Sequence, residues 1–315
     1  MSLPKHFDRM LGKLFRGDIN EIPGCVQERH VEVIQSGIRN SNLVDISPAR
    51  EIHDRMDIGD TYPMQNIAPP WTTFTLLYLN SANQASALHV TSIQFSSSEQ
   101  AQGYLRQFRA SRDAAELCVG ENCKWVLICN RITELNKDAG VMVWPLMFFT
   151  TINNDGSCFK SIYQWLGRRP HSALYEFFGA MPGDTPTKIS KREVDEYFKE
   201  THYEFLSGIE LINCRNVATV PETVKPHMPR GMRKNAPRLR YHTLAINGLS
   251  PQPRKSSSSS ASDLMPLHVC RGSFARYGDD KKLFGKLTGT FWRPMHVKGK
   301  SKNGHVVKDY RLSDK

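Results

Sequence analysis

The part of the sequence that most limits the possible folds is the stretch of residues 72–165, where five segments have the composition of β-strands. Thr72–Leu79 is rich in β-branched and aromatic residues, and Ser86–Phe95 alternates polar and apolar residues after a polar turn, the pattern of a β-hairpin. Three more strand-like segments follow at residues 125–129, 141–151 and 158–165. Strands in this order, with turns between them, predict an antiparallel meander with helices on one face.

An amphipathic helix is predicted near the N-terminus. Ser2 is its expected N-cap, Pro4 lies in its first turn and Gly17 follows its end. Basic residues occupy the outer face, so a membrane surface or a partner's groove is one possible target. The pattern favours docking on the protein's own core, because five large apolar residues recur at helical spacing, namely Phe7, Met10, Leu11, Leu14 and Phe15.

Two further helices are predicted from capping-box spacing, in which a serine is followed three residues later by a glutamate. Ser96 and Glu99 open a helix that runs to about residue 115, and Ser190 and Glu193 open one that reaches residue 206 or beyond. A short helix is expected at His171–Phe178.

The signals between residues 22 and 70 are weaker. Val31–Ile34 is interpreted as a short strand, and Ser47–Glu51 as a capped helical turn. His30, His53 and His89 are scattered, and we expect them at the surface or as hydrogen-bonded core residues.

The composition is that of a soluble globular protein, with 39% hydrophobic and 23% charged residues. No apolar run approaches the roughly 18–20 residues of a membrane-spanning helix, and the longest one, Val141–Thr151, fits a buried strand. The first residues lack the apolar segment and cleavage site of a signal peptide. We therefore expect a cytoplasmic protein.

The seven cysteines are odd in number and widely spaced, which does not indicate a disulfide framework. Cys118, Cys123 and Cys129 have a spacing loosely compatible with a metal site, but a zinc ribbon needs a second tight pair of cysteines. The pattern favours reduced cysteines that serve as small buried residues, and no metal is predicted.

Positive charge is concentrated at the C-terminal end. Residues 225–315 contain 20 Lys and Arg against 5 Asp and Glu, a net charge of +15, whereas the whole chain carries +11. The rest of the chain is therefore slightly acidic. Such an uneven field steers the basic end toward nucleic acid or toward an acidic surface.

The last fifty residues combine these cations with aromatic rings. Cations neutralise phosphates and rings stack on bases, so the mixture predicts contact with RNA or DNA. The residues predicted to make this contact are Arg271, Arg276, Lys281, Lys282, Lys286, Trp292, Arg293 and Lys298.

One set of residues in this region suits catalysis. Metal-independent ribonucleases use a histidine as general base, a second group as acid and a cation at the phosphate. The candidates are His268, Arg271, Tyr277 and His296. The sequence has no phosphate-binding P-loop, dinucleotide fingerprint or H-E-x-x-H motif, so no cofactor is predicted.

A structural interpretation of the same residues stays open. Gly272, Gly285, Gly289 and Gly299 suit turns between short strands. On this interpretation three aromatic residues fill the core of a small β-fold, and the basic residues are its solvated face. These aromatic residues are Phe284, Phe291 and Trp292.

The C-terminal motifs also carry a resemblance to a known family. The pattern H-x-x-R-G-x-F-x-x-Y from His268, followed by L-F-G, G-x-x-W, H-x-K-G and K-D-Y, resembles the signature of a family of uncharacterised bacteriophage and prophage proteins. Residues 211–217 and 239–242 are similar to the segment that precedes it. The resemblance implies a phage protein in the cytoplasm of a host cell. The family pattern has a histidine where this chain has Ser273, which argues against catalysis here.

These observations predict an α+β protein with three regions. Residues 1–220 form an antiparallel sheet with flanking helices, residues 221–265 form a basic connection rich in proline and serine, and residues 266–315 form a small basic β-rich module. The serine-rich tract Pro251–Asp263 is expected to be a linker. The favoured function is nucleic-acid contact through the module. The alternatives are a metal-independent ribonuclease and a regulatory or host-interaction protein that binds an acidic partner.

Overall fold

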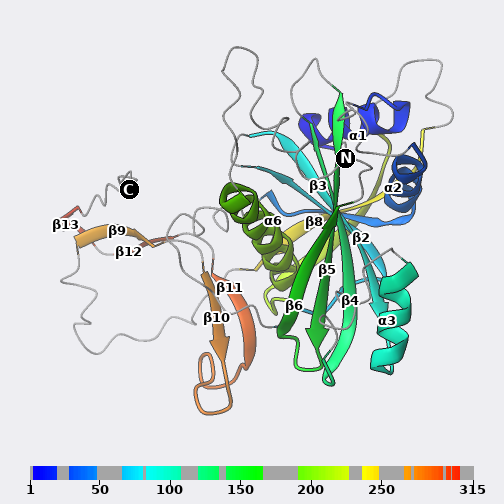
Figure 1. The fold of residues 1–315 in the computed structure, drawn as a ribbon. Helices are drawn as coiled ribbons and strands as arrows, with labels where there is room; N and C mark the ends of the chain where they lie inside the picture. Colours follow the sequence, from blue (N-terminus) through cyan, green and yellow to red (C-terminus); the bar gives the residue numbers. More distant parts are fainter. Residues whose placement is uncertain are drawn as a thin grey trace. The chain divides into compact units, whose positions relative to one another are not determined.

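The computed structural model has the predicted α+β composition and divides into two compact units (Figure 1). The first unit comprises residues 1–213 and 218–245, and the second comprises residues 214–217 and 246–315. The structure describes residues 3–19, 28–47, 66–80, 83–107, 120–134, 140–165, 191–226, 236–247, 266–270, 273–293, 296–298 and 300–305.

An eight-stranded sheet forms the centre of the first unit, in the order β6-β5-β4-β3-β2-β1-β8-β7. Strands β2 to β6 are consecutive in the chain and pair antiparallel, so the predicted meander is confirmed. Strand β1 pairs parallel with both β2 and β8, which makes the sheet mixed. The strands are β1 Asn42–Asp45, β2 Thr73–Leu79, β3 Ala85–Gln94, β4 Cys123–Glu134, β5 Val141–Asn153, β6 Cys158–Trp165, β7 Val217–Val224 and β8 Leu239–Ile246.

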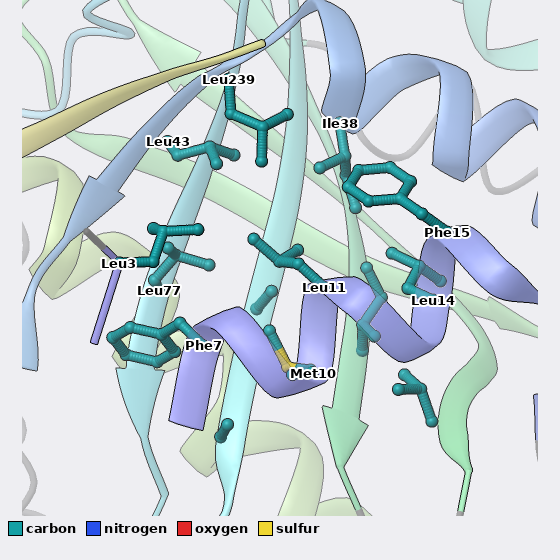
Figure 2. Packing of buried hydrophobic residues seen from close by; sticks show 14 of the residues in the cluster. Leu3, Phe7, Met10, Leu11, Leu14, Phe15, Ile38, Leu43, Leu77 and Leu239 are labelled. Carbon is teal, nitrogen blue, oxygen red and sulfur yellow. The ribbon is translucent and has the colours of Figure 1, made fainter. Parts of the chain in front are cut away.

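Helix α1, Lys5–Arg16, docks on one face of this sheet, as its apolar stripe predicted. It begins after Pro4 and ends at Gly17, whose left-handed φ of 78° allows the chain to leave the helix. Figure 2 shows its apolar side chains packed with Leu43 and Leu77 of the sheet. Burial of each such side chain contributes roughly 1.5–3 kcal/mol. The fully buried ones are Phe7, Met10, Leu11 and Leu14.

A partly buried ion-pair cluster also connects α1 to the sheet. Arg9 donates two hydrogen bonds of 2.7 Å to the carboxylate of Glu134, and Lys13 Nζ lies 3.0 Å from Glu134 Oε1. Burial by itself would raise the pKa of Glu134, but the hydrogen bonds and charges of Arg9 and Lys13 outweigh it and hold that pKa below its ordinary value. Two residues of the basic face of α1, Arg9 and Lys13, therefore form ion pairs within the fold.

Helix α2, Glu28–Asn40, replaces the short strand predicted at Val31–Ile34, so that prediction was wrong. The apolar residues Val31, Ile34 and Ile38 are buried, whereas Val33 is 61% exposed. This spacing of three and four residues belongs to one helix face. In a strand, Val31 and Val33 would have shared a face, and the local β-branched composition obscured the longer period.

Helix α3, Ser98–Gln107, packs through Ala101 and Leu105 on the same sheet face as α1. Its capping box lies one residue later than predicted. The Gln100 backbone N–H donates to Ser97 Oγ at 3.2 Å, and Gln100 Oε1 accepts from the Ser96 backbone N–H at 2.9 Å.

Helix α6, Lys191–Ile212, covers the opposite face of the sheet, so the prediction of helices on one face only was wrong. Adjacent strand residues point to opposite faces, and Leu77 belongs to the cluster under α1 while Leu76 contacts α6. Gly208 permits this contact, since a Cβ on it would lie 2.7 Å from Leu76 Cδ1. The predicted helix from residue 190 to residue 206 or beyond is confirmed.

Strand β8 lies in the first unit, inside the region predicted as a connection. It pairs with β1, with Arg240 opposite Asn42 and Tyr241 opposite Leu43. The structural boundary therefore differs from the one expected at residue 220. The expected helix at residues 171–178, the turn at residues 48–51 and the linker at residues 251–263 lie outside the described residues.

The second unit contains two small sheets. One is the antiparallel pair β10-β11, and the other has the order β12-β9-β13. No described helix in either unit is both long enough and apolar enough to cross a membrane. The strands are β9 Pro266–Cys270, β10 Ser273–Tyr277, β11 Gly289–Arg293, β12 His296–Lys298 and β13 Lys300–His305.

Candidate nucleic-acid interface

The hairpin β10-β11 holds most of the predicted nucleic-acid residues that the structure describes. Its register pairs Phe274 with Trp292 and Tyr277 with Gly289. Directly opposed residues share a face of an antiparallel pair. Two ring pairs pack edge to face, Phe274 on Trp292 with centroids 4.8 Å apart and Tyr277 on Phe291 with centroids 5.8 Å apart.

Asn216 fastens this hairpin to the segment 214–217. Its Oδ1 accepts from the Trp292 backbone N–H at 2.8 Å, and its Nδ2 donates to the Trp292 carbonyl at 2.7 Å. The Arg215 backbone N–H donates to the Thr290 carbonyl at 2.9 Å. A single amide side chain thus satisfies both backbone groups of a buried residue, which makes the hairpin a rigid support.

One arginine lies beside the Tyr277 ring on the hairpin, and a second lies against Gly289, the residue opposite Tyr277. The Arg293 guanidinium carbon lies 5.5 Å from the centre of that ring. The Arg215 side chain lies against Gly289: a Cβ added to Gly289 would be 2.6 Å from Arg215 Nε. Gly289 is the register partner of Tyr277. We call Arg215, Tyr277 and Arg293 the Tyr277 face.

Arg215 was missed by the sequence reasoning, although it stands in the segment that resembles the phage family. Its local sequence, Asn213-Cys214-Arg215-Asn216, contains one cation among polar residues and carries no charge cluster. Only the pairing of this segment with β11 brings Arg215 to the Tyr277 face.

Arg276 does not lie on the Tyr277 face. It pairs with Thr290 on the side of Phe274 and Trp292, while Arg293 pairs with Ser273 on the other side. The two predicted nucleic-acid contacts Arg276 and Arg293 therefore lie on opposite faces of the hairpin, because successive residues of a strand alternate between faces.

Trp292 lies in the core, as the structural interpretation of this region expected, whereas Phe284 does not. Trp292 is 1% exposed, so its ring belongs to the core of the hairpin and is not available to stack on a base. Phe284, expected in the core, is 44% exposed. The reason is tertiary, because the Asn216 segment covers the Trp292 position and the hairpin turn carries Phe284.

Lys281, Lys282 and Lys286 are exposed in the hairpin loop, which we define as residues 278–288. Lys282 forms an ion pair with Asp279 at 3.3 Å. Because both side chains of this pair are exposed, it contributes at most about 1 kcal/mol. Lys282 can therefore exchange Asp279 for a phosphate.

His268 and His296 occupy the ribbon β9-β12, where their backbone register is described. His268 pairs with Lys298, and His296 pairs with Cys270. All four positions share one face of the ribbon, and positions 268 and 296 are diagonal neighbours, which lie about 7–8 Å apart in antiparallel pairs. Arg271 lies outside the described residues, and the predicted catalytic roles stay predictions.

A buried polar layer under α6 contains residues that the sequence reasoning did not select. The Arg131 guanidinium bonds to Thr201 Oγ1 and lies 5.4 Å from the centre of the Trp144 ring. Ser161 Oγ bonds to His202 Nε2. Burial lowers the pKa of His202 to about 4, so the imidazole is neutral at pH 7.

The Ser161 and His202 pair combines a hydroxyl with a neutral base, the two groups of an activated nucleophile. Thr150 Oγ1 also bonds to Ser161 Oγ at 2.8 Å, which holds the hydroxyl within the packing of helix and sheet. We interpret the pair as a structural tie between α6 and the edge strand β6. The sequence signal for this pair is the presence of hydroxyl residues on β5 and β6, where Thr150 lies opposite Ser161.

His89 and three of the described cysteines are core residues, in line with the sequence. His89 is buried, and its Nδ1 lies 3.0 Å from Thr75 Oγ1. Cys123, Cys129 and Cys214 are buried free thiols. Burial raises the pKa of the Cys129 thiol, so it is unreactive at neutral pH.

Comparisons with family models, with curated proteins and with solved structures found no match to this chain.

Proposed function

We propose that this protein contacts nucleic acid through its second unit. The observation that carries the proposal is the Tyr277 face, on which Arg293 lies beside the Tyr277 ring and Arg215 lies against Gly289, the register partner of Tyr277. Guanidinium groups bind phosphate oxygens through several N–H donors in a fixed plane. The half-buried tyrosine ring supplies an apolar surface beside the Arg293 guanidinium.

The charge distribution of the sequence supports the same proposal. Residues 225–315 carry a net charge of +15, and the cations of the hairpin loop follow directly from the Tyr277 face along the chain. RNA and DNA share the phosphate backbone that such a surface recognises. The resemblance to phage and prophage proteins supports a viral source and the host cytoplasm as the place of action.

The test measures binding of the full-length protein to labelled RNA and DNA oligonucleotides by fluorescence anisotropy across a salt series. We expect affinity to fall steeply with salt, because each neutralised phosphate releases counterions. Arg293→Ala and Arg215→Ala should each weaken binding and reduce the magnitude of the log–log salt slope by about one.

Lys124→Ala is the matched control, since Lys124 is a cation 5.9 Å from the centre of the Trp125 ring in the first unit. It should leave affinity unchanged. Binding that is independent of salt, or equal loss in all three variants, would contradict the proposal. Competition by polyglutamate as strong as by nucleic acid would assign the face to an acidic protein partner.

The register of His268 and His296 favours a second candidate function, metal-independent RNA cleavage. Two histidines at diagonal register positions of one ribbon, with Lys298 opposite His268, support general acid–base action on one phosphodiester. Full-length protein with excess EDTA should then cut RNA to 2′,3′-cyclic phosphate ends. His268→Ala and His296→Ala should abolish cutting, and His305→Ala is the control. Persistent cutting by His296→Ala would exclude this candidate.

A further inference from the structure

The hairpin loop displays large apolar side chains in solvent. Phe284 is 44% exposed and Leu287 is 45% exposed. They are two of the four exposed large hydrophobic residues in the described part of the chain, the others being Val33 and Val220. Exposed apolar groups gathered at one place mark a contact site more often than scattered ones do.

The backbone of the loop holds Phe284 outward. Leu283 is buried, and its N–H donates to the Leu287 carbonyl at 2.7 Å, while the Leu287 N–H donates back at 3.0 Å. Between them Phe284 has a φ of 54° and Gly285 a φ of 72°. A left-handed backbone is disfavoured for a residue with a side chain such as phenylalanine. The turn therefore defines the backbone at Phe284, whose side chain is exposed in the unbound protein.

Three lysines lie close to Phe284 in the sequence of the loop. Lys281 and Lys282 precede it, and Lys286 follows it, all of them exposed. The two acidic residues, Asp279 and Asp280, lie at the start of the loop, where Asp279 pairs with Lys282 at 3.3 Å. An exposed apolar ring in a loop that also carries three exposed lysines matches a nucleotide, whose base is flat and whose phosphates are negative.

We propose that the hairpin loop is a stacking platform for an unpaired base, so that the ligand of the second unit is single-stranded nucleic acid. This inference rests on the proposed function and narrows its ligand. A ring can cover the face of a base only where that base is not stacked in a duplex. Stacking does not depend on base identity, so the platform tolerates any sequence.

The experiment compares Phe284→Ala with Val33→Ala in the full-length protein, with single-stranded oligodeoxythymidine as the probe. Val33 is the matched control because it is an exposed aliphatic residue of the first unit, outside the hairpin loop. Phe284→Ala should weaken binding about tenfold, and Val33→Ala should change it less than twofold. Phe284→Tyr should restore binding. The salt slope should be the same in all variants, because no charge is removed.

The outcomes separate this inference from the proposed function. Single-strand binding that is weakened by Arg293→Ala but unchanged by Phe284→Ala overturns the platform and leaves the proposed function intact. Equal affinity of wild-type protein for duplex and single strand also overturns the platform. Absence of any binding by wild-type protein overturns both. Backbone amide exchange of β10 and β11 confirms that each variant keeps the hairpin, since Phe284 has no part in its core.

Discussion

Asn216 and His89 show how single polar side chains stabilise packed regions of this protein. Asn216 is 6% exposed and bonds to both backbone groups of Trp292. His89 is held by Thr75, whose hydroxyl also bonds to Ser41 at 2.8 Å. A buried polar group without partners costs about 1–3 kcal/mol, so these bonds make the burial of both residues possible.

The protonation of His89 gives a prediction for stability against pH. Burial lowers its pKa from 6.5 to about 4. An unfolded chain takes up a proton near pH 6.5, whereas folded His89 stays neutral until about pH 4. Its contribution is therefore complete above pH 6.5 and is lost toward pH 4, by about 1.4 kcal/mol per pH unit.

Urea unfolding at several pH values measures this loss, and NMR titration of the His89 imidazole measures its pKa directly. The control is His89→Gln, whose stability should fall less steeply between pH 6.5 and pH 4. A His89 resonance that titrates near pH 6.5 would show that the ring is accessible in the folded protein.

At the scale of elements, helices α1 and α2 differ in how readily the sequence indicates them. Helix α1 has an uninterrupted apolar stripe with a glycine after its last turn, and both signals are local. Helix α2 carries Val31, Val33 and Ile34, whose β-branched composition indicates a strand. Its contact with the sheet decides its structure, and Gly37 is close enough to His89 that a Cβ there would lie 2.3 Å from Nε2.

Strand β1 was not predicted, because four residues are too short for a recognisable alternation. Its neighbours are β2 and β8, the second of which lies about two hundred residues later in the chain. Parallel pairing of this kind depends on long-range contacts. The same holds for β8, whose alternating charged and apolar residues indicated a strand but not its partner.

At the scale of the whole molecule, the second unit is assembled from two separate segments. Residues 214–217 follow helix α6, and residues 246–315 form the rest. Asn216 donates to the carbonyl of Asn247 at 3.2 Å in addition to its bonds with Trp292. The C-terminal residues therefore depend on a segment that lies outside the predicted module of residues 266–315.

Limited proteolysis tests this dependence. A nonspecific protease that cuts within Pro251–Asp263 should leave a nicked protein whose two pieces elute together, because Asn216 still binds Trp292. Denaturing electrophoresis should separate the pieces. Asn216→Ala should let the C-terminal piece dissociate after the same cut. Separation of the wild-type pieces without denaturant would contradict the two-segment assembly.

The sequence by itself determined the antiparallel meander, helices α1 and α6 and the basic C-terminal end, because periodicity, capping residues and charge are local properties. Only the tertiary structure decided the position of β1, the helical state of α2 and the composition of the Tyr277 face. It also decided that Trp292 is buried and that Phe284 is exposed. Each of these depends on which distant segment covers a residue, as Asn216 covers Trp292, and an aromatic residue has the same local signature whether it is covered or exposed.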